Sequence, residues 1–330
     1  MRSNYYDVIK AIAIIAVVLY HFGTCKFGYL GVDVFLVIAG YFTSQSVDKQ
    51  IANGGGYFSF VKNRLFRLWP LLLLAGGVSL CYGWIMMLPD DFENTAQSVV
   101  ATNFFCNNIL ESITTKNYWD VGNEYKPLMH TWYVGLLMQF YILVPLLLFF
   151  IGRFVKDKNI RKYINICFMM CIGAISLTLY LTTDNECAKF YYLPYRLYEF
   201  SAGSLVSYLF VKKPIATSNR FLSNFCFVVI YVCVFALLFV ETDFISRPVK
   251  LLSTVVLSAL LLYLMPRVNW ARGNVFSNKL VAVIGAASFS IFVWHQVVLA
   301  FIRYSFTNDM MAQLQISVAY FCSIGLYFLV

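Results

Sequence analysis

The sequence carries little charge. Asp, Glu, Lys and Arg make up 12% of its 330 residues, whereas 60% are hydrophobic; soluble domains average about 25% charged residues. This deficit excludes an ordinary soluble protein and is typical of a chain that crosses a membrane many times. The 25 Lys and Arg against 16 Asp and Glu give a formal net charge of +9. In a membrane protein an excess of Lys and Arg sets the orientation of the chain in the membrane. It is therefore no sign of nucleic-acid binding, and the partners we expect are membrane lipids.

Metal-binding patterns are missing as well. The chain has three His, and its nine Cys contain no C-x-x-C pair and no Cys/His cluster, which are the ligand spacings of zinc sites. There is no internal repeat and no low-complexity tract. We therefore expect no metal and no permanently bound cofactor.

Long apolar segments dominate what is present. Each is near the roughly 20 residues that a helix needs to cross the hydrocarbon core. The fold class is therefore an all-α polytopic transmembrane bundle, a single domain over residues 1–330. We expect about ten spans, at 5–23, 28–47, 70–88, 130–152, 163–183, 191–211, 221–240, 248–265, 280–302 and 312–330. The last ends in GLYFLV without a flanking charge, which predicts truncation at or within the final helix.

Basic residues are unevenly shared between alternate loops. The N-terminus and every second loop after it hold 16 Lys and Arg, and the other loops hold 7. Because basic loops stay in the cytoplasm, we expect a cytoplasmic N-terminus. This orientation puts the longest loop, 89–129, on the outer side. Its aromatic residues suit stacking on sugars, and loops of this length are usually functional or mobile.

Ionisable side chains lie within or at the ends of several spans, where they are costly and by default mark a functional site. With this orientation, six share the outer side: His21, Asp33, His130, Arg196, Glu199 and His295. A histidine near a helix end can equally be an interfacial residue, and Arg196 and Glu199 can simply pair on one helix face. The six include every histidine, the side chain best suited to proton transfer near neutral pH.

Basic side chains lie near the inner side. Lys10 and His21 are eleven residues apart, which places them on one face of a helix, roughly 16 Å apart along its axis. Arg64 and Arg67 precede the third span in KNRLFRLWP. Arginine binds phosphate through a bidentate fork. Snorkelling of Lys10 and topological anchoring by the arginines explain the same pattern.

Six segments, in order, resemble signature segments of the acyltransferase-3 family of integral membrane O-acyltransferases. They are YDVIKAIAIIAVVLYHF, GYLGVDVFLVIAGYF, NRLFRLWP, PLMHTWYVGLLMQFYILVP, YRLYEFSAGSL and ASFSIFVWHQVVL. The resemblance implies an enzyme of the bacterial cytoplasmic membrane that transfers an acyl group, usually acetyl. The donor substrate would be a cytoplasmic acyl-CoA such as acetyl-CoA, and the acceptor a hydroxyl of an extracytoplasmic or lipid-linked glycan.

The resemblance also implies roles for individual residues. His21 would be catalytic, as a general base or as a covalent acyl carrier, and Asp33 would orient it. Lys10 stands where the family usually has arginine, and with Arg64 and Arg67 would hold the donor. Acceptor binding or support would fall to His130, Trp132, Arg196, Glu199 and His295.

The chain departs from the family pattern at four positions. Lys10 keeps the positive charge but loses the guanidinium fork, and Ala39 stands where serine is common. Leu137 and Met138 stand where many members have glutamates, so a mechanism that needs a carboxylate on the fourth span does not suit this chain.

Two other functions fit the same pattern. Polytopic helices with intramembrane His, Asp and Arg also describe a proton-coupled transporter or a flippase of a polar or glycolipid substrate. The sequence carries no inverted repeat, which counts mildly against that function. A non-catalytic subunit that passes or senses a glycan is the third interpretation.

The charge split makes the topology testable. Cysteine-labelling reporters placed in 89–129 should react from outside intact cells, and reporters in 153–162 only after permeabilisation. The reverse pattern of labelling would overturn the orientation, and with it the shared outer depth of the six ionisable residues.

Overall fold

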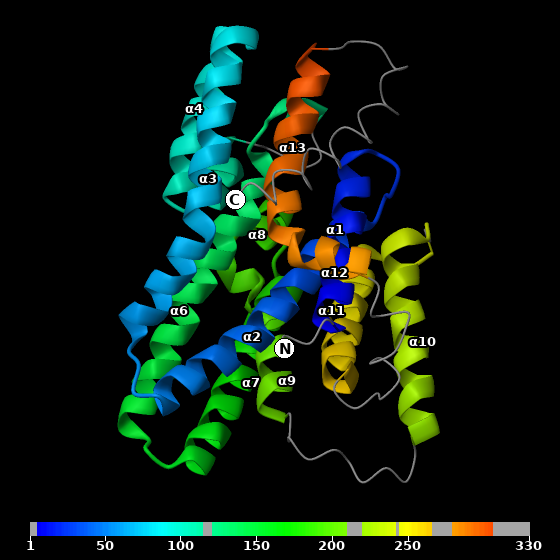
Figure 1. Ribbon diagram of the computed structural model, residues 1–330. Helices are drawn as coiled ribbons and strands as arrows, with labels where there is room; N and C mark the ends of the chain where they lie inside the picture. Colours follow the sequence, from blue (N-terminus) through cyan, green and yellow to red (C-terminus); the bar gives the residue numbers. More distant parts are fainter. Residues whose placement is uncertain (1–4, 115–120, 210–219, 242–243, 266–278, 306–330) are drawn as a thin grey trace. The chain divides into compact units, whose positions relative to one another are not determined.

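The computed structural model describes residues 5–114, 121–209, 220–241, 244–265 and 279–305 (Figure 1). These residues form helices, turns and loops and no strand, which confirms the all-α fold class. The chain divides into two compact units. The first comprises Met1–Tyr57, Val144–Thr178 and Leu197–Ser288, and the second comprises Phe58–Leu143, Leu179–Arg196 and Phe289–Val330.

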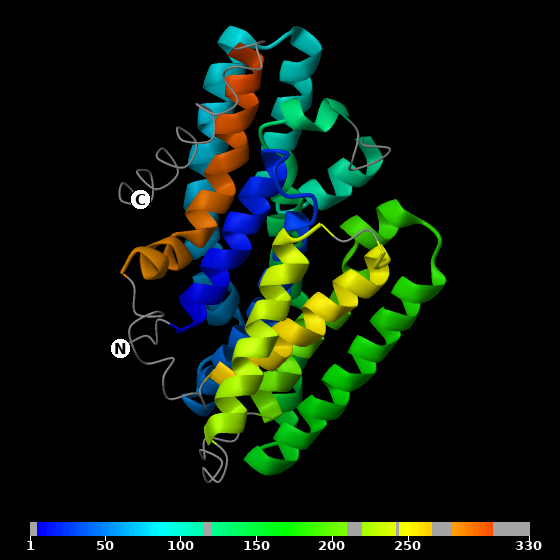
Figure 2. The same cartoon turned by 90° about the vertical axis from the view of Figure 1, so that its right-hand side faces the viewer.

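The first unit is built around the N-terminal helices. Its elements are α1 (Tyr5–His21), η1 (Gly28–Leu30), α2 (Gly31–Ala52), the second half of α6 (Trp132–Phe154), most of α7 (Lys158–Thr182), α9 (Leu197–Leu209), α10 (Arg220–Phe239), α11 (Arg247–Leu264) and α12 (Lys279–Ala286). Helix α2 packs against α1, α9 and α11, and α10 lies beside α11 (Figure 2).

The second unit contains most of the short helices. Its elements are α3 (Tyr57–Met86), α4 (Pro89–Asn103), α5 (Asn107–Thr114), η2 (Val121–Tyr125), η3 (Met129–Thr131), the first half of α6, α8 (Glu186–Tyr191), η4 (Leu193–Tyr195) and α13 (Ser288–Ser305). Helix α5 packs against α4, α8 and η3.

Five helices of the described residues are long and apolar enough to cross a membrane. They are Gly28–Ala52, Tyr57–Met86, Met129–Phe154, Lys158–Thr182 and Arg247–Leu264. A sixth candidate is the pair Leu280–Ala286 and Ser288–Ser305, bent by 74° at its break. Expected spans at 5–23, 191–211 and 221–240 correspond to the shorter helices α1, α9 and α10, and the one at 312–330 lies outside the described residues.

Helix α3 begins thirteen residues before the span expected at 70–88. The expected span, which was placed by its apolar residues, began at Pro70. This proline lies instead inside α3, where it removes one backbone hydrogen bond. The glycines at 54–56 precede the true start at Tyr57. Arg64 and Arg67 therefore belong to the helix and not to the loop before it.

Two other segments also differ from expectation. The segment 89–129, expected as one long loop, contains α4 and α5, and α4 has Pro89 in its first turn with Asp90 and Asp91. An acidic first turn after proline favours a helix start, but the low hydropathy of the segment hid it. Arg196 precedes α9, at the end of η4, and so lies outside the regular helix expected there.

The contact between α2 and α9 depends on two glycines. A Cβ atom at Gly40 would collide with the carbonyl oxygen of Phe200, and one at Gly203 with the carbonyl oxygen of Val37. The two backbones therefore touch directly, as small residues allow between membrane helices. The Ser204 hydroxyl donates a hydrogen bond to the Gly40 carbonyl oxygen at 3.2 Å and ties the helices together.

This packing predicts a strong effect of one methyl group. Gly203→Ala should force α2 and α9 apart and lower stability by about 1–3 kcal/mol, the scale of core overpacking. Gly77→Ala is the matched control, because no atom lies within 4 Å of a Cβ at Gly77 in α3. Thermal unfolding of the purified protein in detergent measures both. Equal melting temperatures for the two variants would contradict the packing argument.

Candidate active site

Lys10 and His21 lie on one continuous helix, as their spacing predicts. Lys10 lies in the second turn of α1, and His21 is the last residue of this helix. Lys10 Nζ lies 2.8 Å from Asp7 Oδ1 and 5.8 Å from the centre of the Phe42 ring. Asp7 was missed in the sequence, although its i, i+3 spacing from Lys10 is an ion-pair signal. The cation at this end of α1 is therefore balanced by a carboxylate.

His21 ends α1 at a sharp reversal of the chain. Gly23 has φ +75°, and its N–H donates to the Tyr20 carbonyl oxygen at 2.9 Å. The His21 ring is partly exposed and packs edge-on against the Tyr20 ring, with centroids 5.2 Å apart. Tyr20 in turn contacts Tyr29 of η1 at 5.7 Å. These aromatic contacts through Tyr20 connect His21 at the end of α1 to η1.

Asp33 lies in the first turn of α2 and is 2% exposed. Two glycines bring this turn against α1. A Cβ at Gly28 would collide with the Ala16 carbonyl oxygen, and one at Gly31 with the Ala13 carbonyl oxygen. The start of α2 therefore lies beside the second half of α1, the half that ends at His21.

Arg196 and Glu199 fall into different units. Arg196 is 4% exposed; its Nε donates to the Phe190 carbonyl oxygen at 3.3 Å, and its guanidinium lies 5.3 Å from the Phe190 ring centre. Glu199 is fully buried in the first turn of α9, in the first unit.

His130 and His295 come together in the second unit, although 165 positions separate them. Their ring centroids are 5.1 Å apart, and each side chain is 1% exposed. His130 Nε2 lies 3.0 Å from the Val293 carbonyl oxygen, and His295 Nδ1 lies 3.1 Å from the Ile291 carbonyl oxygen. Phe292 packs against both rings.

These two contacts fix the tautomers of the neutral rings. A carbonyl oxygen only accepts hydrogen bonds, so the nitrogen that faces it must carry a proton. In the neutral state the lone pair therefore lies on Nδ1 of His130 and on Nε2 of His295. The pair presents defined acceptor atoms within a buried site.

Trp132 supports the same region. It is the first residue of α6, 3% exposed, and packs against Phe190 at 4.4 Å and Tyr191 at 5.7 Å between ring centroids. These contacts join α6 to α8. Its surroundings are aromatic, which suits support of the fold.

Arg64 is held between two aromatic rings. Its guanidinium carbon lies 5.0 Å from the Phe60 ring centre and 5.1 Å from the Tyr141 ring centre. Arg67, three residues later, is exposed. Tyr141 comes from α6, a partner that the sequence alone did not indicate.

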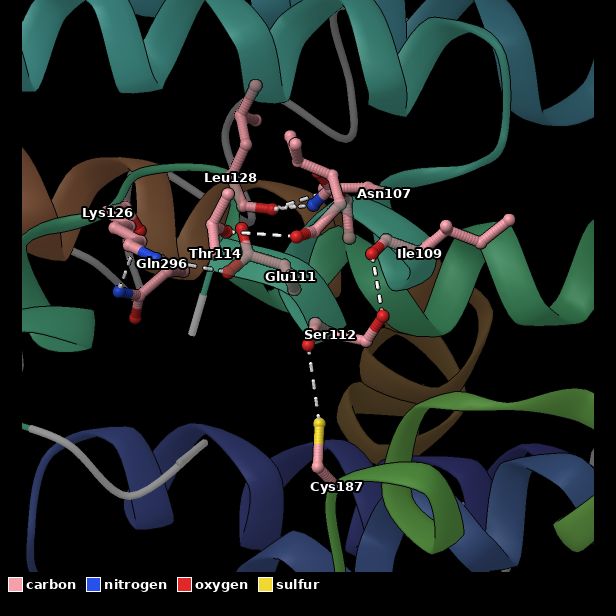
Figure 3. A network of polar contacts seen from close by, with 11 residues as sticks. Asn107, Ile109, Glu111, Ser112, Thr114, Lys126, Leu128, Cys187 and Gln296 are labelled. Carbon is pink, nitrogen blue, oxygen red and sulfur yellow. Dashed lines mark hydrogen bonds and ion pairs between the residues drawn. The ribbon is translucent and has the colours of Figure 1, made fainter. Parts of the chain in front are cut away.

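Polar side chains fix the segment 124–131 (Figure 3). The Asn107 amide donates to the Leu128 carbonyl oxygen at 3.0 Å and to Thr131 Oγ1 at 2.9 Å. Lys126 Nζ lies 3.2 Å from Glu111 Oε2, and Glu111 is 1% exposed. Gln296 donates to the carbonyl oxygens of Glu124 and Lys126 at 3.2 and 3.3 Å. Helices α5 and α13 thus hold the segment 124–131, which contains His130.

Cys187 extends this network to α8. Its thiol donates to the Ser112 carbonyl oxygen at 3.6 Å (Figure 3). Burial raises the pKa of the Cys187 thiol, which keeps it protonated and unreactive. The described cysteines are free thiols, and the described residues hold no cluster of three His, Cys, Asp or Glu able to bind a metal.

The comparisons with known proteins decide the family. A model of an acyltransferase domain, Acyl_transf_3, matches residues 3–330. The chain belongs to the acyltransferase-3 family. With its long apolar helices, this membership identifies an integral membrane protein.

Two relatives are O-acetyltransferase OatA of Staphylococcus aureus strains NCTC 8325 and COL. Each is 24% identical to this chain over 320 residues, which cover 90% of this chain and 50% of the relative. The chain thus spans about half the length of the curated relatives it matches. No solved structure matches this acyltransferase-3 chain.

The fixed tautomer of His130 predicts how it can be replaced. Glutamine can donate from its amide nitrogen as His130 Nε2 does, whereas alanine cannot and leaves a cavity. His130→Ala should lower stability by about 1–3 kcal/mol, and His130→Gln by clearly less. Thermal unfolding in detergent measures the difference. If glutamine destabilises as much as alanine, the hydrogen bond to Val293 does not hold His130 in place.

Proposed function

We propose that this chain is a membrane O-acetyltransferase. In this proposal it moves an acetyl group from a cytoplasmic acyl-CoA to a hydroxyl of an extracytoplasmic or lipid-linked glycan. The observation that carries the proposal is the acyltransferase match over residues 3–330, which includes the whole of α1 with Lys10 and His21. The names of the relatives as O-acetyltransferases support the acetyl group and the hydroxyl acceptor.

Roles in donor binding are proposed for Arg64 and Arg67 in the second unit and, separately, for Lys10 in the first. Coenzyme A carries several phosphate charges, which guanidinium and ammonium groups attract. Stacking between Phe60 and Tyr141 restrains the Arg64 guanidinium, so less conformational entropy is lost when its N–H groups bind a phosphate. Lys10 contributes charge with less strength than an unpaired cation, because Asp7 lies 2.8 Å from it.

His21 is proposed as the general base. A sugar hydroxyl is a weak nucleophile until a base takes its proton. As the hydroxyl oxygen forms an ester bond with the acetyl carbon, the bond from that carbon to sulfur breaks. His21 takes the hydroxyl proton and returns it to the departing thiolate, which leaves as coenzyme A with a free thiol. Atoms and charge balance without any other reactant.

Asp33 is proposed to assist His21. A buried carboxylate stabilises a neighbouring imidazole when it becomes positively charged, and it favours one orientation of the ring. The 2% exposure of Asp33 and its place in the first turn of α2, which packs on the second half of α1, support this role. Leu137 and Met138, both buried in α6, provide no carboxylate for the task.

Radiolabelled acetyl-CoA tests the function and the base together. Membranes that contain the chain should transfer label to a glycan, and His21→Ala should reduce transfer by roughly a hundred-fold or more, the scale of general-base catalysis. His130→Ala and His295→Ala should reduce acetyl transfer per membrane-inserted molecule less than His21→Ala does. Glycan movement without labelling would show a carrier. Near-normal transfer by His21→Ala together with none by His295→Ala would move the catalytic role to α13.

A further inference from the structure

The second unit contains a polar pocket that none of the roles above uses. The pocket is open to solvent, and its empty space of about 380 Å³ includes the solvent at its mouth. The side chains that give it chemical character are Asp91, Asn94, Ser98, Tyr125, Lys126 and Tyr304. They come from α4, from the end of η2 and the residue after it, and from the end of α13.

One wall of the pocket is a single face of α4. Asp91, Asn94, Thr95 and Ser98 are spaced by three or four residues, so they lie in line along the helix. Thr95 and Ser98 are 4% and 7% exposed, whereas Asn94 is exposed. The wall therefore offers a carboxylate, an amide and two hydroxyls in a row, with the amide at the open side.

The other wall is aromatic. The rings of Tyr125 and Tyr304 meet edge to face, with centroids 5.7 Å apart and planes at 86°. The Tyr304 hydroxyl donates to Asp91 Oδ2, which holds the carboxylate at the pocket wall. Tyr125 is 45% exposed, so much of its ring remains accessible to a ligand.

The network of Figure 3 keeps the Tyr125 side of the pocket rigid. Gln296 holds the carbonyl groups on both sides of Tyr125, at Glu124 and Lys126. Arg303 also donates to the Glu124 carbonyl oxygen at 3.0 Å. Because the backbone is fixed before a ligand arrives, binding loses little entropy there.

The charges of the pocket disfavour an anionic ligand. Among its lining residues Lys126 is the one cation, and its ammonium lies 3.2 Å from the Glu111 carboxylate. Asp91 adds a negative charge at the opposite wall. The phosphates of coenzyme A or the carboxylate of an acidic sugar would meet no excess of positive charge.

We infer that this pocket binds a neutral pyranose unit of a glycan. Sugar hydroxyls can donate to the Asp91 carboxylate and exchange hydrogen bonds with the Asn94 amide, while the C–H face of the ring packs on Tyr125. That this glycan is the acetyl acceptor rests on the proposed function. The binding itself does not.

Saturation-transfer NMR on the purified protein in detergent tests the binding. The probes are two neutral tetrasaccharides, chitotetraose and cellotetraose. At least one should bind saturably, and Asn94→Ala and Tyr125→Ala should each raise its dissociation constant about fivefold or more. Gln97→Ala is the matched control, because Gln97 is exposed on the same helix, pairs with Glu93 and does not line the pocket. It should bind like the wild type.

Three results would overturn the inference. They are no saturable binding of either tetrasaccharide, unchanged affinity in Asn94→Ala and Tyr125→Ala, and displacement of the sugar by coenzyme A. Acetyl transfer, assayed separately with the labelled donor, keeps the two proposals apart. If a sugar binds, its binding depends on Asn94 and no acetyl is transferred, the inferred sugar site is supported and the proposed enzyme activity is rejected. Transfer with an unchanged acceptor KM in Asn94→Ala supports the enzyme and shows that the sugar in the pocket is not the acceptor.

Discussion

Direct contact between helix backbones at glycine organises the first unit. Membrane helices gain little from burying apolar side chains against one another, since lipid is equally apolar, so close packing must hold them together. Gly40 and Gly203 let α2 and α9 touch. Gly31 lets the start of α2 touch α1, and Gly285 lets α12 approach α1 at the Asp7 carbonyl oxygen. Glycine contacts therefore fix α1 at its start, beside Asp7, and at its middle, beside Ala13.

Residue type and spacing revealed the class of fold and the family. Apolar runs separated by basic loops indicated a helical membrane protein, and six ordered segments indicated the acyltransferase-3 family; both are confirmed. Helix limits were less accessible. Helix α3 continues through Pro70 and begins at Tyr57, before the apolar run by which its span was placed. Helix α4 is not apolar enough to be found by hydropathy.

Contacts between distant residues could not be predicted from one sequence. The ring contact of His130 with His295, the stacking of Tyr141 on Arg64 and the donation from Gln296 to Glu124 each join separate helices. No local pattern encodes which helices are neighbours. The Asp7–Lys10 pair differs, because its partners lie one turn apart, and the i, i+3 rule would have found it.

The length of α3 sets the depth at which its arginines stand. Its 30 residues span about 45 Å, whereas the hydrocarbon core is about 30 Å thick, so roughly ten residues must project into the headgroup layer. Pro70 cannot donate to the Phe66 carbonyl oxygen, and such an oxygen is poorly tolerated against lipid tails. A Tyr57 end in the hydrated layer would satisfy both conditions, because it brings the Phe66 carbonyl oxygen toward the membrane surface. Arg67, which is exposed, would then stand near the lipid phosphates, so a soluble anion would compete with headgroups for it.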